Sequence, residues 1–227
     1  MKAKVNIRVE YEGSCSIIVM DAGENRINDD FVKQFHAALD EVEKNDDAKV
    51  LITTGTGKYY SNGLDLDWLK DQTAQRMTEL RFTLNNLLAR ILTFKLPTIA
   101  AANGHCFAGG GLLFLAHDYR IMRKERGWFC LPEIHLKMTF PPFWTQIYRY
   151  RISDKNVLRD IVYLGKRFTA DEAVKSKFVD LAIPGDQLLK SAIQFGEKQL
   201  AKANLSPEVL HSLKLDMFES ELKYSKL

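Results

Sequence analysis

Residues 103–111 could stabilise negative charge with backbone groups. The three glycines from Gly109 to Gly111 lead into the apolar run Leu112–Ala116, which predicts a short helix buried on every side. A glycine-rich entry leaves the first N–H groups of such a helix uncovered, so that they can donate to an oxygen that carries or gains negative charge. The same glycines could instead only let the helix pack closely on a strand. The stretch by itself does not separate these two interpretations.

Two other stretches carry groups suited to the same chemistry. Residues 60–66, with the sequence Y-S-N-G-L-D-L, follow the apolar segment Val50–Thr54 and predict a turn with a second set of exposed N–H groups. Glu133 lies between Pro132 and Ile134, and burial among apolar neighbours would raise its carboxyl pKa and help it accept and return a proton. Taken alone, Glu133 could equally be a solvated loop residue, which is the commonest place for a glutamate.

Motifs for phosphate, metal or serine-hydrolase chemistry are incomplete. Gly55–Lys58 lacks the spacing and the following Ser or Thr of a phosphate-binding loop, and Gly109–Gly111 lacks the spacing of a dinucleotide fold. The five histidines form no H-E-x-x-H pattern, and Ser61 has no G-x-S-x-G setting. The sequence therefore predicts neither a metal nor a cofactor of the protein's own.

Alternating strands and helices must position these groups. Periodicity predicts strands at residues 4–10, 15–20, 50–54, 98–102, 119–122, 128–131 and 178–183. It predicts helices at residues 28–42, 65–70, 74–94, 112–116, 144–151, 154–164 and 187–203, with further helices capped by Thr169 and Ser206. Residues 132–143 are predicted to form a loop. This alternation favours the α/β class with a largely parallel sheet.

Composition narrows the function classes. The chain has 227 residues, 46% of them hydrophobic and 27% charged, as in a globular protein, and its net charge of +3 comes with no dense Lys/Arg block that would indicate nucleic-acid binding. Three cysteines without a C-x-x-C pair favour a reducing compartment. No apolar run reaches the roughly eighteen residues of a membrane span, and the N-terminus has no signal-peptide core. We expect one core domain, residues 1–183, and a C-terminal helical appendage, residues 184–227.

Together these motifs resemble the enoyl-CoA hydratase/isomerase (crotonase) family. They are S-N-G-L-D-L at 61–66, P-T-I-A-A-A-N-G-H at 97–105, A-G-G-G at 108–111, H-D-Y-R-I at 117–121, P-E-I at 132–134 and F-T-A-D-E-A-V-K-S-K-F-V-D at 168–180. The resemblance extends to about Ile183. It implies a crotonase-like α/β fold of repeated ββα units with a largely parallel sheet and C-terminal helices. It also implies an acyl-CoA thioester substrate and a homotrimer.

The resemblance further implies a role for each motif. The N–H groups of Leu64 and Gly109 would form an oxyanion hole, with Gly110 as the alternative to Gly109. Glu133 would be the catalytic carboxylate. The residues that would bind the substrate are Ser61, Asn62, Gly63, Leu64, Asp65, Gly109 and Gly110.

The number of carboxylates separates the activities of the family. Its hydratases use two glutamates, and here the first of the two positions holds Leu112, or Leu113 if the alignment shifts by one residue. Only Glu133 remains, and a single base can carry a proton from C2 to C4 of a thioester. This is the pattern of the Δ3,Δ2-enoyl-CoA isomerases of fatty-acid β-oxidation, and residues 142–144 (P-F-W) resemble that subgroup too.

Two departures from the family pattern keep other activities open. Lys137 stands where the family commonly has glycine, and one extra residue lies between Asp118 and Glu133. The alternatives are a hydratase or thioester hydrolase of the same superfamily, or an inactive subunit that binds CoA esters as a scaffold.

The last three residues predict a location. Ser225-Lys226-Leu227 is the S-K-L tripeptide that the peroxisomal import receptor binds. We therefore expect a peroxisomal matrix protein.

Overall fold

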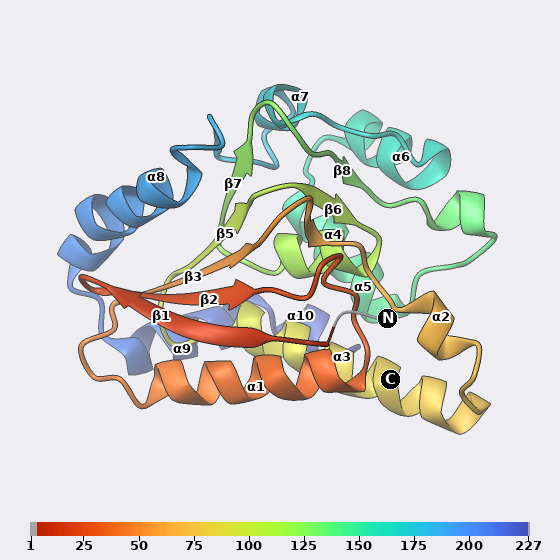
Figure 1. Cartoon of the computed structure of the whole chain (residues 1–227), viewed down its shortest axis with the longest axis horizontal. Coiled ribbons are helices and arrows are strands. Elements are labelled where there is room, and N and C mark those ends of the chain that lie inside the picture. The colour runs from red at the N-terminus through yellow and green to blue at the C-terminus, as the bar shows by residue number, and fades with distance from the viewer. Residues whose placement is uncertain (1–3, 227) are drawn as a thin grey trace.

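A six-stranded sheet forms the centre of the computed structural model, which describes residues 4–226 (Figure 1). The strand order is β1-β2-β3-β5-β7-β9; β1 and β2 pair antiparallel and all other neighbours pair parallel. The strands are β1 (Ile7–Glu12), β2 (Cys15–Met20), β3 (Val50–Gly55), β5 (Thr98–Ala102), β7 (Tyr119–Arg123) and β9 (Leu181–Ile183). The predicted α/β architecture with a largely parallel sheet is confirmed.

Alternate residues of these strands enter two separate apolar cores, one on each face of the sheet. Ile18 and Leu51 belong to the larger core, which includes the buried faces of α1 (Asp29–Glu43) and α3 (Ala74–Leu92). Ile17 and Ile52 point to the other face, which α8 (Leu188–Phe195) covers. Figure 1 shows α1 and α3 along one side of the sheet and α8 along the other.

A second sheet has three parallel strands, each of which follows a strand of the larger sheet in the sequence. Its order is β4-β6-β8, formed by β4 (Tyr59–Ser61), β6 (His105–Phe107) and β8 (Phe129–Cys130). The sequence predicts only β8. The prediction that residues 60–66 form a turn throughout is wrong, because Tyr60 and Ser61 belong to β4. Strands of two or three residues are too short to show a period of two.

Several predicted helix ends are confirmed. The Asn28 side chain accepts from the N–H of Phe31 at 3.0 Å to begin α1. Thr169 and Glu172 form the predicted capping box of α7 (Ala170–Lys175). Gly165, with φ of 56°, ends α6 (Lys155–Leu164) in the left-handed conformation.

Three other predictions need correction. The loop predicted at 132–143 contains a 3₁₀ helix, η1 (Glu133–Leu136), and α5 (Pro142–Arg151) begins inside it because Pro142 suits a first helical turn. The strand predicted at 178–183 is only β9. The single helix predicted at 187–203 is α8 followed by a π turn, η2 (Gly196–Leu200), and a 3₁₀ turn, η3 (Ala201–Ala203).

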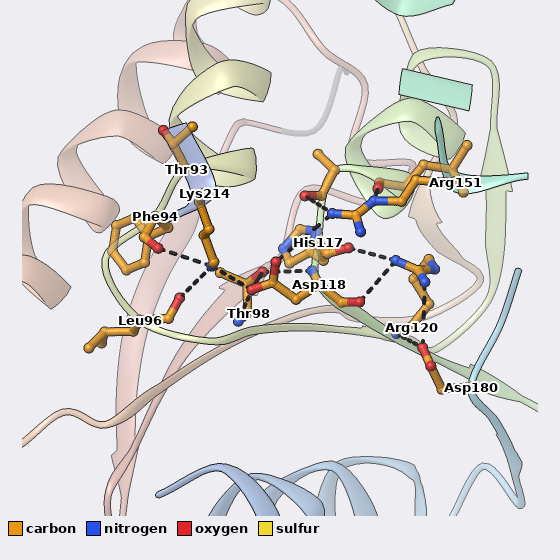
Figure 2. Close-up of polar contacts among 12 residues, drawn as sticks. Thr93, Phe94, Leu96, Thr98, His117, Asp118, Arg120, Arg151, Asp180 and Lys214 are labelled. Atoms are coloured by element: carbon orange, nitrogen blue, oxygen red, sulfur yellow. Dashed lines mark hydrogen bonds and ion pairs between the residues drawn. The ribbon is translucent and has the colours of Figure 1, made fainter. Parts of the chain in front are cut away.

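The C-terminal helices are tied to the core by buried charge. The remaining α-helices of residues 4–226 are α2 (Leu66–Leu69), α4 (Gly109–Leu115), α9 (Pro207–Met217) and α10 (Glu219–Leu222), and α4 packs against β4 and β6 of the second sheet. Lys214 of α9 is 5% exposed; its Nζ donates to the carbonyl oxygens of Phe94 and Leu96 at 3.0 Å each and to the Asp118 carboxylate at 2.5 Å (Figure 2). Asp118 in turn accepts from the backbone N–H and the hydroxyl of Thr98.

No helix among residues 4–226 is long and apolar enough to cross a membrane. The three cysteines, Cys15, Cys106 and Cys130, are buried free thiols.

Candidate active site

A cavity of about 400 Å³ opens where the second sheet, α2, α4, η1 and α5 meet. Its apolar wall includes Leu66, Phe107, Leu136, Met138 and Trp144. Its polar groups come from Arg26, Asn62, Asp67, Lys70, Glu133 and Thr139 and from the backbone of Leu64, Ala108 and Gly109. A site of this size, mostly apolar with a few convergent polar groups, suits a small organic ligand.

The segment after β4 is held rigidly against residues 24–27. The Ser61 hydroxyl donates to the carbonyl oxygen of Asn25 at 2.7 Å and accepts from the N–H of Gly63 at 3.2 Å. The N–H of Ile27 donates to the Gly63 carbonyl at 2.8 Å. These bonds use the backbone on either side of Leu64. The N–H of Leu64 itself has no acceptor among residues 4–226.

Close contact between this segment and the start of α4 requires a glycine at position 63. Gly63 has φ of 79°, and a methyl group on its Cα would lie 2.9 Å from the Phe107 carbonyl oxygen and 3.0 Å from the Gly109 nitrogen. Because Gly63 has no side chain, the two segments can approach closely. Leu64 and Gly109 therefore both line the cavity. The N–H of Gly109 also has no acceptor in the described part of the chain.

Ala108 produces the turn that frees the N–H of Gly109. Its φ of 50° and ψ of −127° are unusual for a residue with a side chain. The N–H groups of Gly111 and Leu112 donate to the Ala108 carbonyl oxygen at 2.8 and 3.2 Å respectively. Gly110 instead packs against β4, where an added methyl group would lie 2.3 Å from the Ser61 carbonyl oxygen.

Glu133 is the buried acid of the cavity. It follows β8 as the first residue of η1, is 4% exposed, and its Oε2 has no hydrogen-bond partner within residues 4–226. Burial raises its carboxyl pKa to about 7, although a hydrogen bond with its own backbone partly opposes this. A carboxyl with this pKa can both take up and release protons near neutral pH.

The only other carboxylate lining the cavity, as far as the structure describes the chain, is Asp67 at its mouth. The side chain of Asp67 is 51% exposed and forms salt bridges with Arg26 at 2.8 Å and Lys70 at 3.1 Å. Leu112 and Leu113 are fully buried in the larger core. No second buried acid therefore faces Glu133 from α4.

The structure brings some of the predicted site residues together and leaves others behind the wall. Asn62, Leu64, Gly109 and Glu133 line the cavity. The predicted binding residues outside its lining are Ser61, Gly63, Asp65 and Gly110, of which Asp65 accepts from the Trp68 N–H to cap α2. Lys137 adopts the left-handed conformation, with φ of 55°, which glycine adopts freely and residues with a side chain adopt uncommonly.

Sequence reasoning missed several lining residues, including Arg26, Lys70, Ala108 and Met138. Arg26 follows β2 by six residues and carries no recognisable spacing to the other motifs. Ala108 belongs to the A-G-G-G motif, but an alanine does not indicate the unusual backbone conformation that the structure shows at this position.

The arrangement supports one kind of chemistry. Two free N–H groups can receive the oxygen of a polarised carbonyl, and the nearby carboxylate can move a proton on the carbon chain beside it. No group of three or more His, Cys, Asp or Glu side chains among residues 4–226 is arranged to hold a metal ion.

A family model and curated relatives match most of the chain. The model of the enoyl-CoA hydratase/isomerase family matches residues 10–223. The Arabidopsis thaliana protein named enoyl-CoA delta isomerase 2, peroxisomal, is 31% identical over 219 residues, which cover 92% of this chain and 91% of the relative. The short-chain-enoyl-CoA hydratase of Clostridium acetobutylicum is 24% identical over 201 residues, covering 87% of this chain and 76% of the relative.

A solved structure shares the fold. The probable enoyl-CoA hydratase EchA3 of Mycobacterium tuberculosis superposes with a TM-score of 0.88 at 23% identity, over 97% of this chain and 91% of that one. The α/β crotonase fold implied by the sequence motifs is thus confirmed.

Proposed function

Because the chain belongs to the enoyl-CoA hydratase/isomerase family, we propose that it is an enoyl-CoA isomerase, which converts 3-enoyl-CoA to trans-2-enoyl-CoA in fatty-acid β-oxidation. The observation that carries the proposal is the single buried carboxylate. Glu133 lies in the apolar cavity with an unpartnered oxygen, while the motif alignment puts a leucine, Leu112 or Leu113, at the position of a hydratase's other catalytic glutamate.

The reaction needs one base and two donors. The N–H groups of Leu64 and Gly109 receive the thioester oxygen, and Glu133 removes a proton from C2. The electron pair of that C–H bond delocalises into the thioester as a dienolate, whose negative oxygen the two donors stabilise. Glu133 then returns the proton to C4, which leaves the double bond between C2 and C3.

The surroundings of Glu133 suit a proton that must be taken and given back. A carboxyl with an ordinary pKa would be a weak base toward carbon, whereas burial raises the pKa of Glu133 to about 7. The free Oε2 needs no other partner to be displaced before it meets the substrate. An oxyanion-hole donor contributes about 3–4 kcal/mol of transition-state stabilisation in acyl-transfer enzymes.

Replacing the carboxyl tests the proposal. Glu133→Gln keeps the side-chain size but cannot take the proton, so isomerisation of 3-enoyl-CoA should fall by about 10²–10⁴-fold. Glu219→Gln, on the exposed surface of α10, is the matched control and should retain wild-type rates. Full isomerase activity in folded Glu133→Gln would reject the role of Glu133.

A hydratase is the second candidate, favoured by the relative of that name at 24% identity. Hydration must activate a water molecule across the double bond. The other carboxylate of the cavity's described lining, Asp67, is held at the mouth by Arg26 and Lys70. We therefore expect little conversion of trans-2-enoyl-CoA to the 3-hydroxy thioester, and rapid hydration by the wild-type protein would favour this second candidate.

We propose the peroxisomal matrix as the location. The tripeptide predicts it, and the peroxisomal isomerase of Arabidopsis is a relative; Leu227 lies outside the described residues. A fluorescent protein fused ahead of Met1 should give punctate fluorescence that overlaps a peroxisomal marker. The same pattern after deletion of residues 225–227 would contradict receptor recognition of this tripeptide.

We propose a homotrimer as the assembly. α9 exposes Val209, Leu213 and Met217, each at more than half of its surface, and an apolar stripe of this kind is often covered by another chain. Light scattering should give three times the chain mass of 26.0 kDa. A monomeric mass at micromolar concentration would contradict this assembly.

A further inference from the structure

Asn85 is a polar residue on the buried face of α3. It is 1% exposed and lies among Leu84, Leu87 and Leu88, which belong to the larger apolar core. A buried amide is costly unless both of its ends are hydrogen-bonded. An asparagine here therefore needs specific partners.

Both ends of the Asn85 amide are used, and they join segments far apart in the sequence. Its Oδ1 accepts from the indole Nε1 of Trp144 in α5 at 2.8 Å. Its Nδ2 donates to the backbone carbonyl oxygen of Ser225 at 3.3 Å. One side chain thus connects α5 with the C-terminal tail, defined here as residues 223–226.

Trp144 is the member of this chain of bonds that reaches the cavity. It is 6% exposed and lines the same cavity as Glu133. An indole ring presents a large flat surface, and its single N–H fixes how the ring is turned. The hydrogen bond to Asn85 therefore determines which part of the ring faces the cavity.

The tail is packed in this structure, so binding of the tripeptide by the import receptor would require Ser225 to leave its bond with Asn85. Ser225 is 6% exposed, and its hydroxyl donates to the Leu222 carbonyl at 2.8 Å. Before α10, the ring of Phe218 packs on that of Tyr150 of α5 with centroids 4.7 Å apart, and Arg151 lies 5.3 Å from the same ring. The start of α10 is therefore held against α5, the helix that carries Trp144, while the tail after α10 is bonded to Asn85 of α3.

We propose that Asn85 is a positioning residue and that the docked tail, through the Ser225 carbonyl, sets the wall formed by Trp144 and thereby the acyl groups that the cavity accepts. The ligand class in this proposal, an acyl-CoA thioester, rests on the proposed function. The chain of hydrogen bonds from the tail to Trp144 is independent of that function. A role for Asn85 limited to holding the tail would leave ligand selection unchanged.

Three variants break the chain at different points, and one leaves it intact. Asn85→Leu removes both hydrogen bonds and replaces the amide by an apolar side chain of similar size. Deletion of residues 225–227 removes the Ser225 carbonyl and leaves the bond between Asn85 and Trp144. Trp144→Phe removes the indole N–H together with the five-membered part of the ring. Ser225→Ala is the matched control, since the bond to Asn85 uses the backbone carbonyl, which this variant retains.

The measurement is calorimetric binding of CoA, butyryl-CoA and octanoyl-CoA, none of which contains a double bond to isomerise. We expect CoA itself to bind each variant as it binds the wild type. The ratio of the octanoyl-CoA and butyryl-CoA dissociation constants should change about three- to tenfold in the three variants, the size of effect expected from one lost hydrogen bond. It should not change in Ser225→Ala.

A second measurement is independent of ligand. In a protein whose other tryptophans, Trp68 and Trp128, are replaced by phenylalanine, the emission maximum of Trp144 should shift on Asn85→Leu and on tail deletion. Unchanged emission, or an unchanged ratio of dissociation constants in folded Asn85→Leu, overturns the proposal. A wild-type protein that binds these thioesters without isomerising 3-enoyl-CoA would reject the proposed function while leaving this inference intact.

Discussion

The properties of Glu133 follow from where its carboxyl lies and from what it lacks. It is buried in an apolar wall, and its Oε2 has no partner in the described chain. Asp67 at the cavity mouth and Glu24, which lies outside the cavity lining, have pKa values below the ordinary range because they accept hydrogen bonds from Lys70 and Asn62 respectively. A carboxyl group is thus a salt-bridge partner of low pKa near the surface and a group of raised pKa in the interior, because solvation and hydrogen-bond partners differ.

The pH dependence of the rate follows from this pKa. The base must be ionised to remove the C2 proton, and the raised pKa means that the ionised form becomes dominant only above about pH 7. We expect kcat/KM for 3-enoyl-CoA to rise with pH to a plateau, with a midpoint near pH 7. Initial rates from pH 5 to 9 test this, and a flat profile down to pH 5 would contradict a raised pKa for the essential base.

The proposed oxyanion hole leads to a prediction about Gly109. Gly109→Pro removes the free N–H, so kcat should fall by about 10²–10³-fold, the cost of losing one such donor. Gly109→Ala is the matched control, because an added methyl group would lie 3.5 Å from Ile27 Cδ1, an ordinary contact, and the N–H remains. Circular dichroism must show that both variants are folded. Equal activity of the two would place the donor elsewhere.

Elements with long-range periodicity are predictable from the sequence, and short ones are not. The caps at Asn28 and Thr169 and the strands of the large sheet follow from local patterns. The strands β4 and β6 have three residues each, and pairing with distant strands forms them rather than their own preference. The sequence does not predict the 3₁₀ helix that begins at Glu133, because its four residues are too few to show a helical period.

The candidate site shows the same limit. Family motifs pointed to Leu64, Gly109 and Glu133, and all three line one cavity; their catalytic roles stay predictions. Nothing local marks Asn85, whose partners Trp144 and Ser225 lie 59 and 140 residues away in the sequence. Such contacts exist only once the chain has folded.

The attachment of α9 makes a prediction at the scale of elements. Lys214→Met leaves the Asp118 carboxylate without its closest cation and two carbonyl oxygens without their donor, which should lower the free energy of unfolding by about 3 kcal/mol. Lys190→Met, at an exposed position of α8, is the control and should change little. Urea denaturation checks both, and equal stabilities would show that packing alone holds α9.

At the scale of the whole molecule, the two ends of α4 differ in how their buried polar groups are satisfied. The N–H at its start has no partner in the described chain, whereas the carbonyl groups at its end are hydrogen-bonded. The free N–H of Gly109 faces the cavity at one end of this helix. At the other end, Arg151 donates to the carbonyl of Leu115 and Arg120 to that of His117 (Figure 2). These arginines satisfy the carbonyl groups that a helix end leaves open, in a buried region where water could not. The charged cluster around Asp118 therefore supports the fold, while the cavity keeps groups unsatisfied for a substrate.

An unsatisfied acid should lower the stability of the whole molecule in a pH-dependent way. The folded-state pKa of Glu133 is raised from 4.5 to about 7, so the folded protein holds this proton more tightly than the unfolded chain does. Stability from this group is therefore fully present below about pH 4.5 and is lost as pH rises through about 7, by about 3 kcal/mol in total.

Glu133→Gln stays neutral and should avoid the loss, so it should unfold at a higher urea concentration than the wild type at pH 8. At pH 5 the two proteins should be nearly equal. Denaturation curves at both pH values decide the matter, and a Glu133→Gln variant that is no more stable than the wild type at pH 8 would show that the carboxylate is solvated in the folded protein.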